Sequence, residues 1–275
     1  MSALEQWAAG LAAWAIPQPV LDRAEDSPWV LPRQVFVRRA DRQITAPVGA
    51  SYQRAAAALT QPGTVLDIGA AAGAASLPLA GRMPVTRITA VDTDEPLLTA
   101  FRDRATRLGV PARVVLGRWP DAAAQTSVAD IVVCGHVLYN VAELGSFATA
   151  LTTHARRRVV AELTARHPLT ALNPLWRRFH GITRPEGPTA EDCVAALAEV
   201  GIHPRVTRWR RPAQPEYGDF AELVDVTRRR LCLPATATAQ VEAAVRDLGV
   251  DPAQPPDLGS SGRDLVTLSW DGVAS

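Results

Sequence analysis

VLDIGAAAGAAS, residues 65–76, is the stretch that decides the fold. The β-branched and apolar side chains of residues 64–68 are typical of a strand buried on both faces of a parallel sheet. Gly69 and Gly73 then predict a turn, because glycine lets the backbone bend sharply and lets a ligand approach main-chain N–H groups. We expect a helix over residues 74–80, with its positive N-terminal end facing that ligand.

Two acids follow the pattern of a nucleotide-type site. Asp67 lies at the end of the first strand and should project into the crevice. Asp92 ends a second strand, RITAVD, where a carboxylate can accept hydrogen bonds from both ribose hydroxyls. Asp94 is the competing acid, and we expect it to cap a helix over residues 95–108. The same capping role is the alternative for Asp92.

Further predicted strands follow, so that strands and helices alternate along the chain. ARVVLG precedes Arg118, and ADIVVCG is followed by His136, at the strand end where ligands bind in open α/β sheets. RRRVVAEL is the fifth strand. TAEDCVAALAEVGI predicts an amphipathic helix, and PRVTRWR and RDLVTLSW predict the last two strands.

This order resembles the class I (Rossmann-like) S-adenosylmethionine-dependent methyltransferases over residues 60–165. The family motif, acid-x-Gly-x-Gly-x-Gly, is matched by Asp67, Gly69 and Gly73, with Ala71 at the middle glycine. A nicotinamide fingerprint, G-x-G-x-x-G, fits less well, because alanines stand where it needs glycines.

The resemblance implies a doubly wound α/β fold with a seven-stranded, mostly parallel sheet. We expect a helical cover or lid over residues 1–60 and a methyltransferase domain over residues 61–275. Within that domain we expect a substrate segment at 166–188 and a helical insertion at 212–262, before the last strand.

The resemblance also implies S-adenosylmethionine as cofactor and S-adenosylhomocysteine as product. Trp119 could stack on adenine, or could be a core or lid tryptophan. The candidate cofactor-binding residues are Asp67, Gly69, Ala70, Ala71, Gly73, Asp92, Thr93, Arg118, Trp119, Cys134, Gly135 and His136. No metal is expected, because the segments after the fourth and fifth strands offer mainly Asn140 and Glu162 as ligands.

The cover and the segment 166–188 supply the candidate substrate residues. These are Trp29, Phe36, Arg39, Tyr52, Tyr139, Asn140, Asn173, Trp176 and Arg177. A helix over residues 169–179 would place the last three of these on one face with His180. The same spacing equally predicts a helix that packs Trp176 into a core.

A hydroxyl or protonated amine acceptor needs a base, and histidine titrates in the useful range. His136 is the first candidate because it follows the fourth strand, and His180 and His167 come next. A buried structural histidine is the alternative for each.

Composition narrows the class of protein. The 275 residues have a net charge of +1, with 47% hydrophobic and 21% charged residues, as in a globular protein. No apolar run is long enough for a membrane span, so we expect a cytoplasmic protein. We also expect a monomer or a homodimer. The three cysteines are expected to be reduced core residues. All 29 basic residues are arginine, a GC-rich coding bias that suggests an actinobacterial source.

Three hypotheses remain. The first, which we favour, is a methyltransferase that acts on an O or N atom of a small molecule, with secondary metabolism as the expected setting. The second is an RNA or protein methyltransferase, with arginine clusters such as residues 208–211 forming the contact surface; the near-neutral charge disfavours nucleic acid but leaves it open. The third is a non-catalytic protein that binds S-adenosylmethionine.

Overall fold

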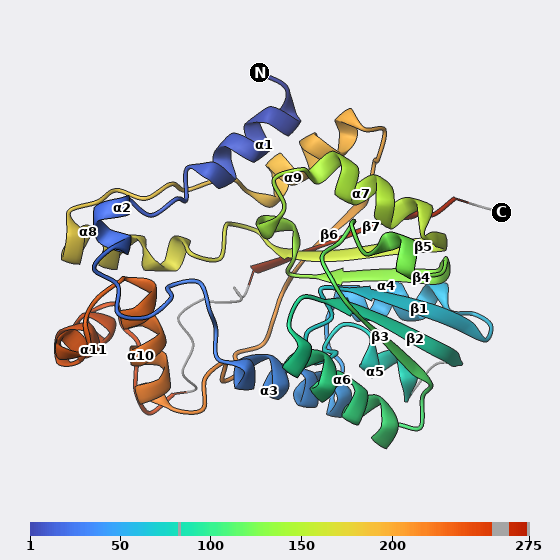
Figure 1. Ribbon diagram of the computed structural model, residues 1–275, viewed down its shortest axis with the longest axis horizontal. Helices are drawn as coiled ribbons and strands as arrows, with labels where there is room; N and C mark the ends of the chain where they lie inside the picture. The colour runs from blue at the N-terminus through green and yellow to red at the C-terminus, as the bar shows by residue number, and fades with distance from the viewer. Residues whose placement is uncertain (82–83, 255–263, 274–275) are drawn as a thin grey trace.

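The computed structural model describes residues 1–81, 84–254 and 264–273. Its centre is one seven-stranded sheet in the order β3-β2-β1-β4-β5-β7-β6 (Figure 1). The strands are β1 (Gly63–Ile68), β2 (Val85–Asp92), β3 (Ala112–Leu116), β4 (Ala129–Gly135), β5 (Ala155–Thr164), β6 (Arg205–Arg210) and β7 (Asp264–Asp271). Only β7 runs antiparallel to its neighbours β5 and β6. The predicted class I methyltransferase fold is confirmed.

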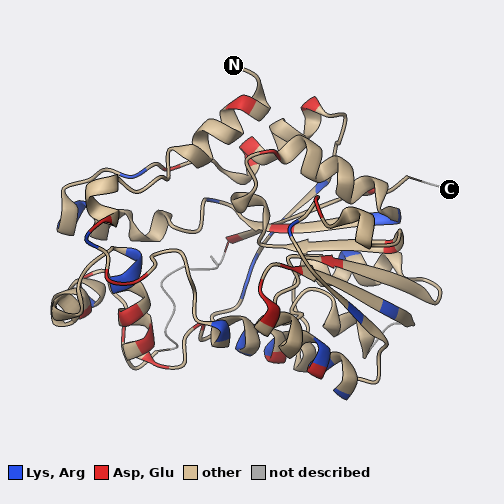
Figure 2. Cartoon of the chain, in the orientation of Figure 1, with Lys and Arg blue, Asp and Glu red and all other residues tan. Residues whose placement is uncertain are grey.

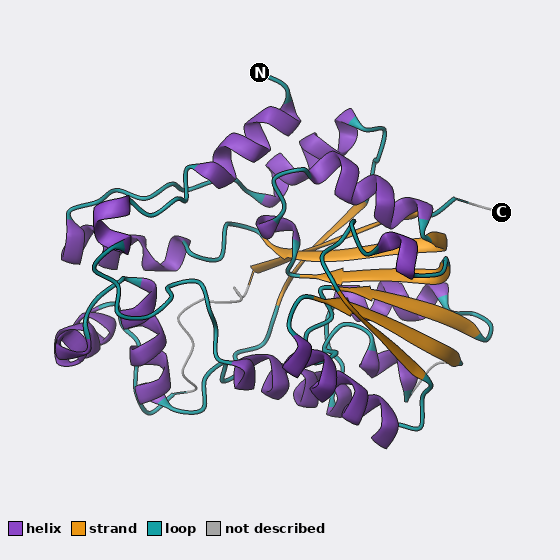
Figure 3. Cartoon of the chain, viewed as in Figure 1, coloured by secondary structure: helices purple, strands orange, loops and turns teal. Residues whose placement is uncertain are grey.

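Helices cover both faces of the sheet (Figure 3). α1, α7 and α9 lie over one face, and α3, α4, α5 and α6 lie over the other (Figure 1). The α-helices are α1 (Ala3–Ala12), α2 (Gln18–Leu21), α3 (Arg33–Thr45), α4 (Ala50–Ala58), α5 (Leu77–Ala80), α6 (Glu95–Arg107), α7 (Leu144–Thr153), α8 (Asn173–His180), α9 (Ala190–Glu199), α10 (Phe220–Arg230) and α11 (Thr238–Asp247). Short 3-10 turns are η1 (Ala123–Gln125), η2 (Leu138–Asn140), η3 (Thr170–Leu172) and η4 (Ala235–Ala237).

β1 lies near the middle of the sheet and pairs in parallel with β2 and β4. Leu66 is in register with Thr89 on one side and with Val132 on the other. Its apolar side chains are buried, as expected for a strand covered on both faces. Because the strands are parallel, the loops that follow β1, β2, β3 and β4 meet at one edge of the sheet.

The loop after β1 differs from the expected helix over residues 74–80. Residues 71–76 form turns, and α5 begins only at Leu77. The Ser76 hydroxyl donates a 2.5 Å hydrogen bond to the buried Asp67 carboxylate, which draws this loop down onto β1. Gly69 and Gly73 have φ of 70° and 98°, and a Cβ on either would overlap neighbouring side chains. A four-residue helix carries little dipole, so α5 does not supply the positive helix end that the sequence predicted here.

The N-terminal 60 residues do not form a single cover over the edge of the sheet where the loops meet. α1 packs on α7 and α9, away from the loop edge (Figure 1). Trp7 is fully buried there, stacks on Tyr139 and donates from Nε1 to the Val141 carbonyl at 2.8 Å. α1 therefore belongs to the main core. Among the N-terminal 60 residues, only those from residue 30 onward reach the edge of the sheet where the loops after β1, β2, β3 and β4 meet.

A second cluster of buried side chains unites segments that are distant in sequence. α2, α8, α10 and α11 gather beside the sheet, at the left in Figure 1. Their shared core contains Val20, Leu172, Leu175, Trp176, Leu223, Val226, Val241 and Val245. The segment 166–188 and the insertion 212–262 thus pack together, although residues 255–262 of that insertion lie outside the described residues. In the described ranges, no helix is long and apolar enough to cross a membrane.

We expect Trp7→Ala to lower the free energy of unfolding by about 3–5 kcal/mol, because it removes a fully buried indole and its hydrogen bond. Urea denaturation measures this. Trp29→Ala is the matched control and should change stability by about 0.5 kcal/mol or less, since Trp29 is 53% exposed. Equal effects of the two substitutions would show that α1 is not part of the core.

Candidate active site

A cavity of about 600 Å³ lies where the parallel strands end. The loops after four strands line it: residues 69–72 after β1, 92–94 after β2, 117–119 after β3, and 134–137 after β4. The opposite wall comes from the segment before α3, from α3 and α4, from β5, and from the end of β6. Its residues include Val30, Leu31, Phe36, Arg39, Gln43, Ser51, Tyr52, Glu162, Trp209, Arg211 and Gln214.

Asp92 ties two of these loops together. One carboxylate oxygen accepts from the Ala71 N–H at 2.7 Å, and the other accepts from the Asp94 N–H at 3.0 Å. Each oxygen keeps a lone pair for a further donor. Asp94 caps α6 by accepting from the Leu97 N–H at 2.9 Å, and it also pairs with Arg33. The capping role thus falls to Asp94, as expected, and Asp92 faces the cavity.

Asp67 lies beneath the loop instead of in the cavity wall, which corrects the expectation that it projects into the crevice. It is fully buried and holds Ser76. Burial raises its pKa to about 7, against the opposing effect of the Ser76 hydrogen bond. Gly73 is also absent from the cavity lining and packs against Leu77 and Phe101. Both residues shape the loop from below.

Trp119 is buried in the cavity wall and touches His154 edge-on, with ring centroids 4.9 Å apart. Its indole Nε1 has no hydrogen-bond partner among the described residues. A buried N–H without a partner is costly, and a ligand acceptor would satisfy it. Arg118, beside it, is exposed at the cavity rim.

His136 and Glu162 form the ionisable pair of the cavity. His136 follows β4, and its Nε2 lies 3.2 Å from Glu162 Oε1. Its backbone N–H donates to the Glu162 carbonyl at 2.7 Å, and the Ser51 hydroxyl donates to the other carboxylate oxygen. Burial alone would raise the pKa of Glu162, but the hydrogen bonds from His136 and Ser51 and the charge of Arg211 hold it below its usual range. Glu162 therefore faces the imidazole as an ionised carboxylate.

The other two candidate bases lie elsewhere. His167 stacks on Trp14 with centroids 4.0 Å apart, and burial, with Arg184 and Arg230, lowers its pKa to about 4. His180 makes a 2.7 Å hydrogen bond from Nε2 to the Leu231 carbonyl. Neither lines the cavity, so both take the structural role that was the alternative.

The candidate substrate residues divide in the same way. Phe36, Arg39, Tyr52 and Asn140 line the cavity, whereas Trp29, Tyr139, Asn173, Trp176 and Arg177 do not. Tyr139 donates to the Thr164 carbonyl, and Asn173 donates to the Pro185 carbonyl at 2.9 Å. Trp176 is buried in the second core. The one-faced pattern of α8 is thus a packing face, which corrects its assignment to the acceptor pocket.

Several cavity residues were missed by reasoning from the sequence. Ser51 and Gln214 carry no local motif, Trp209 and Arg211 were considered only within the arginine cluster 208–211, and Glu162 was considered only as a metal ligand. Glu162 could have been found, because it is an acid near the end of the strand beside β4, in register with Gly135.

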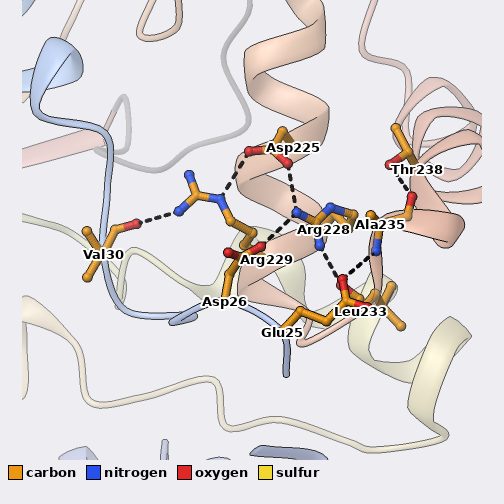
Figure 4. Close-up of polar contacts among 9 residues, drawn as sticks. All are labelled: Glu25, Asp26, Val30, Asp225, Arg228, Arg229, Leu233, Ala235 and Thr238. Carbon is orange, nitrogen blue, oxygen red and sulfur yellow. Dashed lines mark hydrogen bonds and ion pairs between the residues drawn. The ribbon is translucent and has the colours of Figure 1, made fainter. Parts of the chain in front are cut away.

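The segment 25–31 runs from the second core to the cavity. The Ala235 N–H donates to Glu25 at 2.9 Å, Arg228 pairs with Asp26 at 3.0 Å, and Arg229 donates to the Val30 carbonyl at 3.4 Å (Figure 4). α10 and η4 therefore position Val30, which lines the cavity.

The arginine clusters are largely paired with acids. Arg156 and Arg157 face Asp130, at 3.9 and 3.5 Å, and Arg178 pairs with Asp247 at 2.6 Å. Acidic and basic residues are interspersed along the chain (Figure 2). Over the described ranges, no group of three or more His, Cys, Asp or Glu side chains is arranged to hold a metal ion.

Part of the chain is similar to a known family. Residues 65–161 match the family described as "Methyltransferase domain". This region spans β1 to most of β5 and contains the loops after β1, β2, β3 and β4 that line the cavity. Residues 65–161 are therefore similar to a methyltransferase domain, and they lie within a sheet of the class I methyltransferase fold.

Solved structures support the same fold over nearly the whole chain. Magnesium protoporphyrin IX methyltransferase from Synechocystis PCC 6803, with bound S-adenosylhomocysteine, has a TM-score of 0.52 at 15% identity, covering 92% of this chain and 93% of that one. An S-adenosylmethionine-dependent methyltransferase from Thiobacillus denitrificans in complex with S-adenosylhomocysteine has a TM-score of 0.50 at 16% identity, covering 87% and 98%. YcgJ from Bacillus subtilis has a TM-score of 0.51 at 16% identity, covering 82% and 99%. A comparison with curated proteins found no match.

Asp67 should make the stability of the fold depend on pH. Because its pKa is raised to about 7 in the folded protein, folding favours the protonated form. This contribution is complete below about pH 4 and is lost as the pH rises through 7. The free energy of unfolding should fall by up to about 1.4 kcal/mol per pH unit across this window. Urea denaturation at several pH values measures the slope.

Asp67→Asn should remove this part of the slope, since the amide does not titrate. Asp103→Asn, at an exposed position on α6, is the control and should keep it. An identical slope in Asp67→Asn and the unaltered protein would contradict the assignment.

Proposed function

We propose that the protein is an S-adenosylmethionine-dependent methyltransferase that acts on an oxygen, or alternatively a nitrogen, of a small molecule. One observation carries the proposal: the loops after β1, β2, β3 and β4 and the His136–Glu162 pair all line the same cavity. We also propose that the acceptor is a compound of secondary metabolism. A screen for the acceptor should therefore begin with such compounds.

The residues present fit the cofactor. The loop after β1 lines the cavity with small residues at positions 69–72, the spare lone pairs of Asp92 suit ribose hydroxyls, and Trp119 offers an aromatic ring in the cavity wall. When bound, S-adenosylmethionine supplies an electrophilic methyl group on its sulfonium. The work left to the protein is to hold the acceptor atom in line with that group.

His136 is the proposed general base. Donation from Nε2 to the Glu162 carboxylate leaves Nδ1 as the ring nitrogen that can take a proton from the acceptor hydroxyl. Glu162, held ionised by its neighbours, stabilises the imidazolium that results. The Ser51 hydrogen bond holds the carboxylate in place.

The shape of the site favours a small acceptor over a macromolecule. Side chains from α3 and α4 line one side of the cavity, together with Val30 and Leu31. Arg157 and Arg178, from two of the arginine clusters, are already paired with acids. A steep decrease of RNA affinity with salt would instead support the RNA methyltransferase alternative.

Calorimetric titration with S-adenosylmethionine, S-adenosylhomocysteine and NAD tests the proposal directly. We expect the two adenosyl ligands to bind and NAD not to bind. Asp92→Ala should weaken adenosyl-ligand binding by about 1.5–3 kcal/mol, because it removes a charged acceptor. Asp103→Ala, on an exposed face of α6, is the control and should leave affinity unchanged. Failure of the folded, unaltered protein to bind either adenosyl ligand would refute the proposal.

With an acceptor in hand, His136→Asn should lower kcat by about 10²–10⁴-fold, since it removes the base. Asparagine is chosen because it tolerates the positive φ of 60° at this position. Affinity for S-adenosylhomocysteine should stay within about twofold, because Asp92 and the glycine loop are untouched. His203→Asn, at an exposed position, is the control. An unchanged kcat in His136→Asn would exclude His136 as the base.

A further inference from the structure

α3, α4 and β6 each contribute one aromatic side chain to the lining of the cavity. These are Phe36 on α3, Tyr52 on α4 and Trp209 on β6. Aromatic rings offer flat apolar faces, and a planar ligand ring stacks on such a face better than a saturated, puckered ring does. The lining from these three elements therefore favours a ligand with an aromatic ring.

Trp209 is held in place from two sides. Its Nε1 donates to the Thr267 hydroxyl on β7 at 3.1 Å. A Cβ at Gly49 would lie only 2.5 Å from Cη2 of the indole, so the ring rests on the backbone just before α4. An aromatic side chain that is fixed before the ligand arrives loses little conformational entropy on binding. Trp209 is therefore a preformed surface of the cavity.

The sheet brings Trp209 close to the His136–Glu162 pair. Thr267, which accepts the indole hydrogen bond, is in register with Glu162 on the neighbouring strand β5. Residues paired in this way point to the same face of a sheet, with Cβ atoms about 5 Å apart. Trp209 and Glu162 therefore lie on the two strands that flank Thr267, and Glu162 contacts the imidazole of His136.

Tyr52 approaches the same pair from α4. The residue before it, Ser51, donates a hydrogen bond to the Glu162 carboxylate. Both Ser51 and Tyr52 line the cavity. One ring thus comes from the sheet and one from α4, and both lie near the groups proposed to remove the proton of the acceptor.

The proposed base also favours an aromatic hydroxyl. A phenol has a pKa of about 10, as in tyrosine, whereas an aliphatic hydroxyl resembles water, with a pKa of about 15.7. At equilibrium, a given imidazole therefore takes the proton of a phenol about 10⁵–10⁶-fold more readily. A histidine supported by one carboxylate suits the first kind of hydroxyl and not the second.

We propose that the acceptor is a phenol, whose aromatic ring lies against Trp209 and Tyr52 while its hydroxyl reaches His136. This inference rests on the proposed function and adds the chemical class of the acceptor. The phenol oxygen forms the bond to the methyl carbon as the carbon–sulfur bond breaks, and that electron pair remains on sulfur. The phenol proton passes to Nδ1 of His136. The products are an aryl methyl ether and S-adenosylhomocysteine.

Matched aromatic and saturated probes test this with the intact protein saturated with S-adenosylhomocysteine. The pairs are 4-ethylphenol with 4-ethylcyclohexanol, and 2-naphthol with decahydro-2-naphthol, and calorimetry measures their affinities. In at least one pair, the phenol should bind about fivefold or more tightly than its saturated partner. Equal binding in both pairs, a preference for the saturated partner, or no phenol binding at millimolar concentration would overturn the inference.

Variants assign the preference to Trp209. Trp209→Leu removes the flat face and should reduce the preference for the phenol to about twofold or less. Trp209→Phe keeps a planar ring and should retain most of the preference. Trp29→Leu is the matched control, because Trp29 does not line this cavity, and it should keep the full preference. An undiminished preference in Trp209→Leu would overturn the placement of the acceptor ring.

Trp209→Leu also loses the hydrogen bond to Thr267, so its melting temperature is measured alongside. If it does not fold, Tyr52→Leu removes the other ring and is read in the same way. S-adenosylhomocysteine binding by the unaltered protein separates the two hypotheses. Its absence refutes the proposed function, whereas its presence without a preference for the phenol refutes only the aromatic acceptor.

Discussion

The parallel pairing of β1 with β2 and β4 is the constraint on which the site depends. Because these strands point the same way, their following loops meet at one edge, and each contributes a different kind of group. The Asp92 carboxylate then joins the first two loops through the N–H groups of Ala71 and Asp94. A buried, rigid sheet thus brings together groups that lie far apart in sequence.

The side of the cavity formed by α3 and the segment after β6 depends on a different interaction, the burial of Glu216 among arginines. A carboxylate without water is stable only when cations and hydrogen bonds replace its hydration. Arg39 and Arg42 come from α3, and Arg211 comes from the end of β6. The ion pairs therefore fix the segment between β6 and α10 against α3. The charges that shape the ligand side of the cavity are the same charges that hold its two walls together.

Local patterns predicted the strands and the loops after β1, β2, β3 and β4 that line the cavity. The seven strands, the glycine turn and the cap at Asp94 follow from short-range chemistry, and the structure has them. The prediction of a helix over residues 74–80 was wrong, because Ser76 donates a hydrogen bond to the buried Asp67 and this favours turns over helix. The residues on the proposed acceptor side of the cavity were harder to predict. Trp176 on α8 has the spacing of a pocket residue and of a core residue alike, and only the packing of α8 on α10 and α11 decides between them. Arg211 follows β6 and is linked to Arg39 and Arg42 of α3 through Glu216, an arrangement that no local pattern encodes.

Backbone strain marks the same place by an independent route. Among the described residues, three non-glycine residues have a positive φ: Ala71, His136 and Cys232. Cys232 follows α10 at the position where helices commonly end in a left-handed residue. Ala71 and His136 have no such local reason, and both line the cavity. Each is held by its main-chain N–H, Ala71 by the Asp92 carboxylate and His136 by the Glu162 carbonyl. Such conformations cost about 1–3 kcal/mol and persist where neighbouring groups enforce them. The two acids of the site therefore hold in shape the loops on which the ligand would lie.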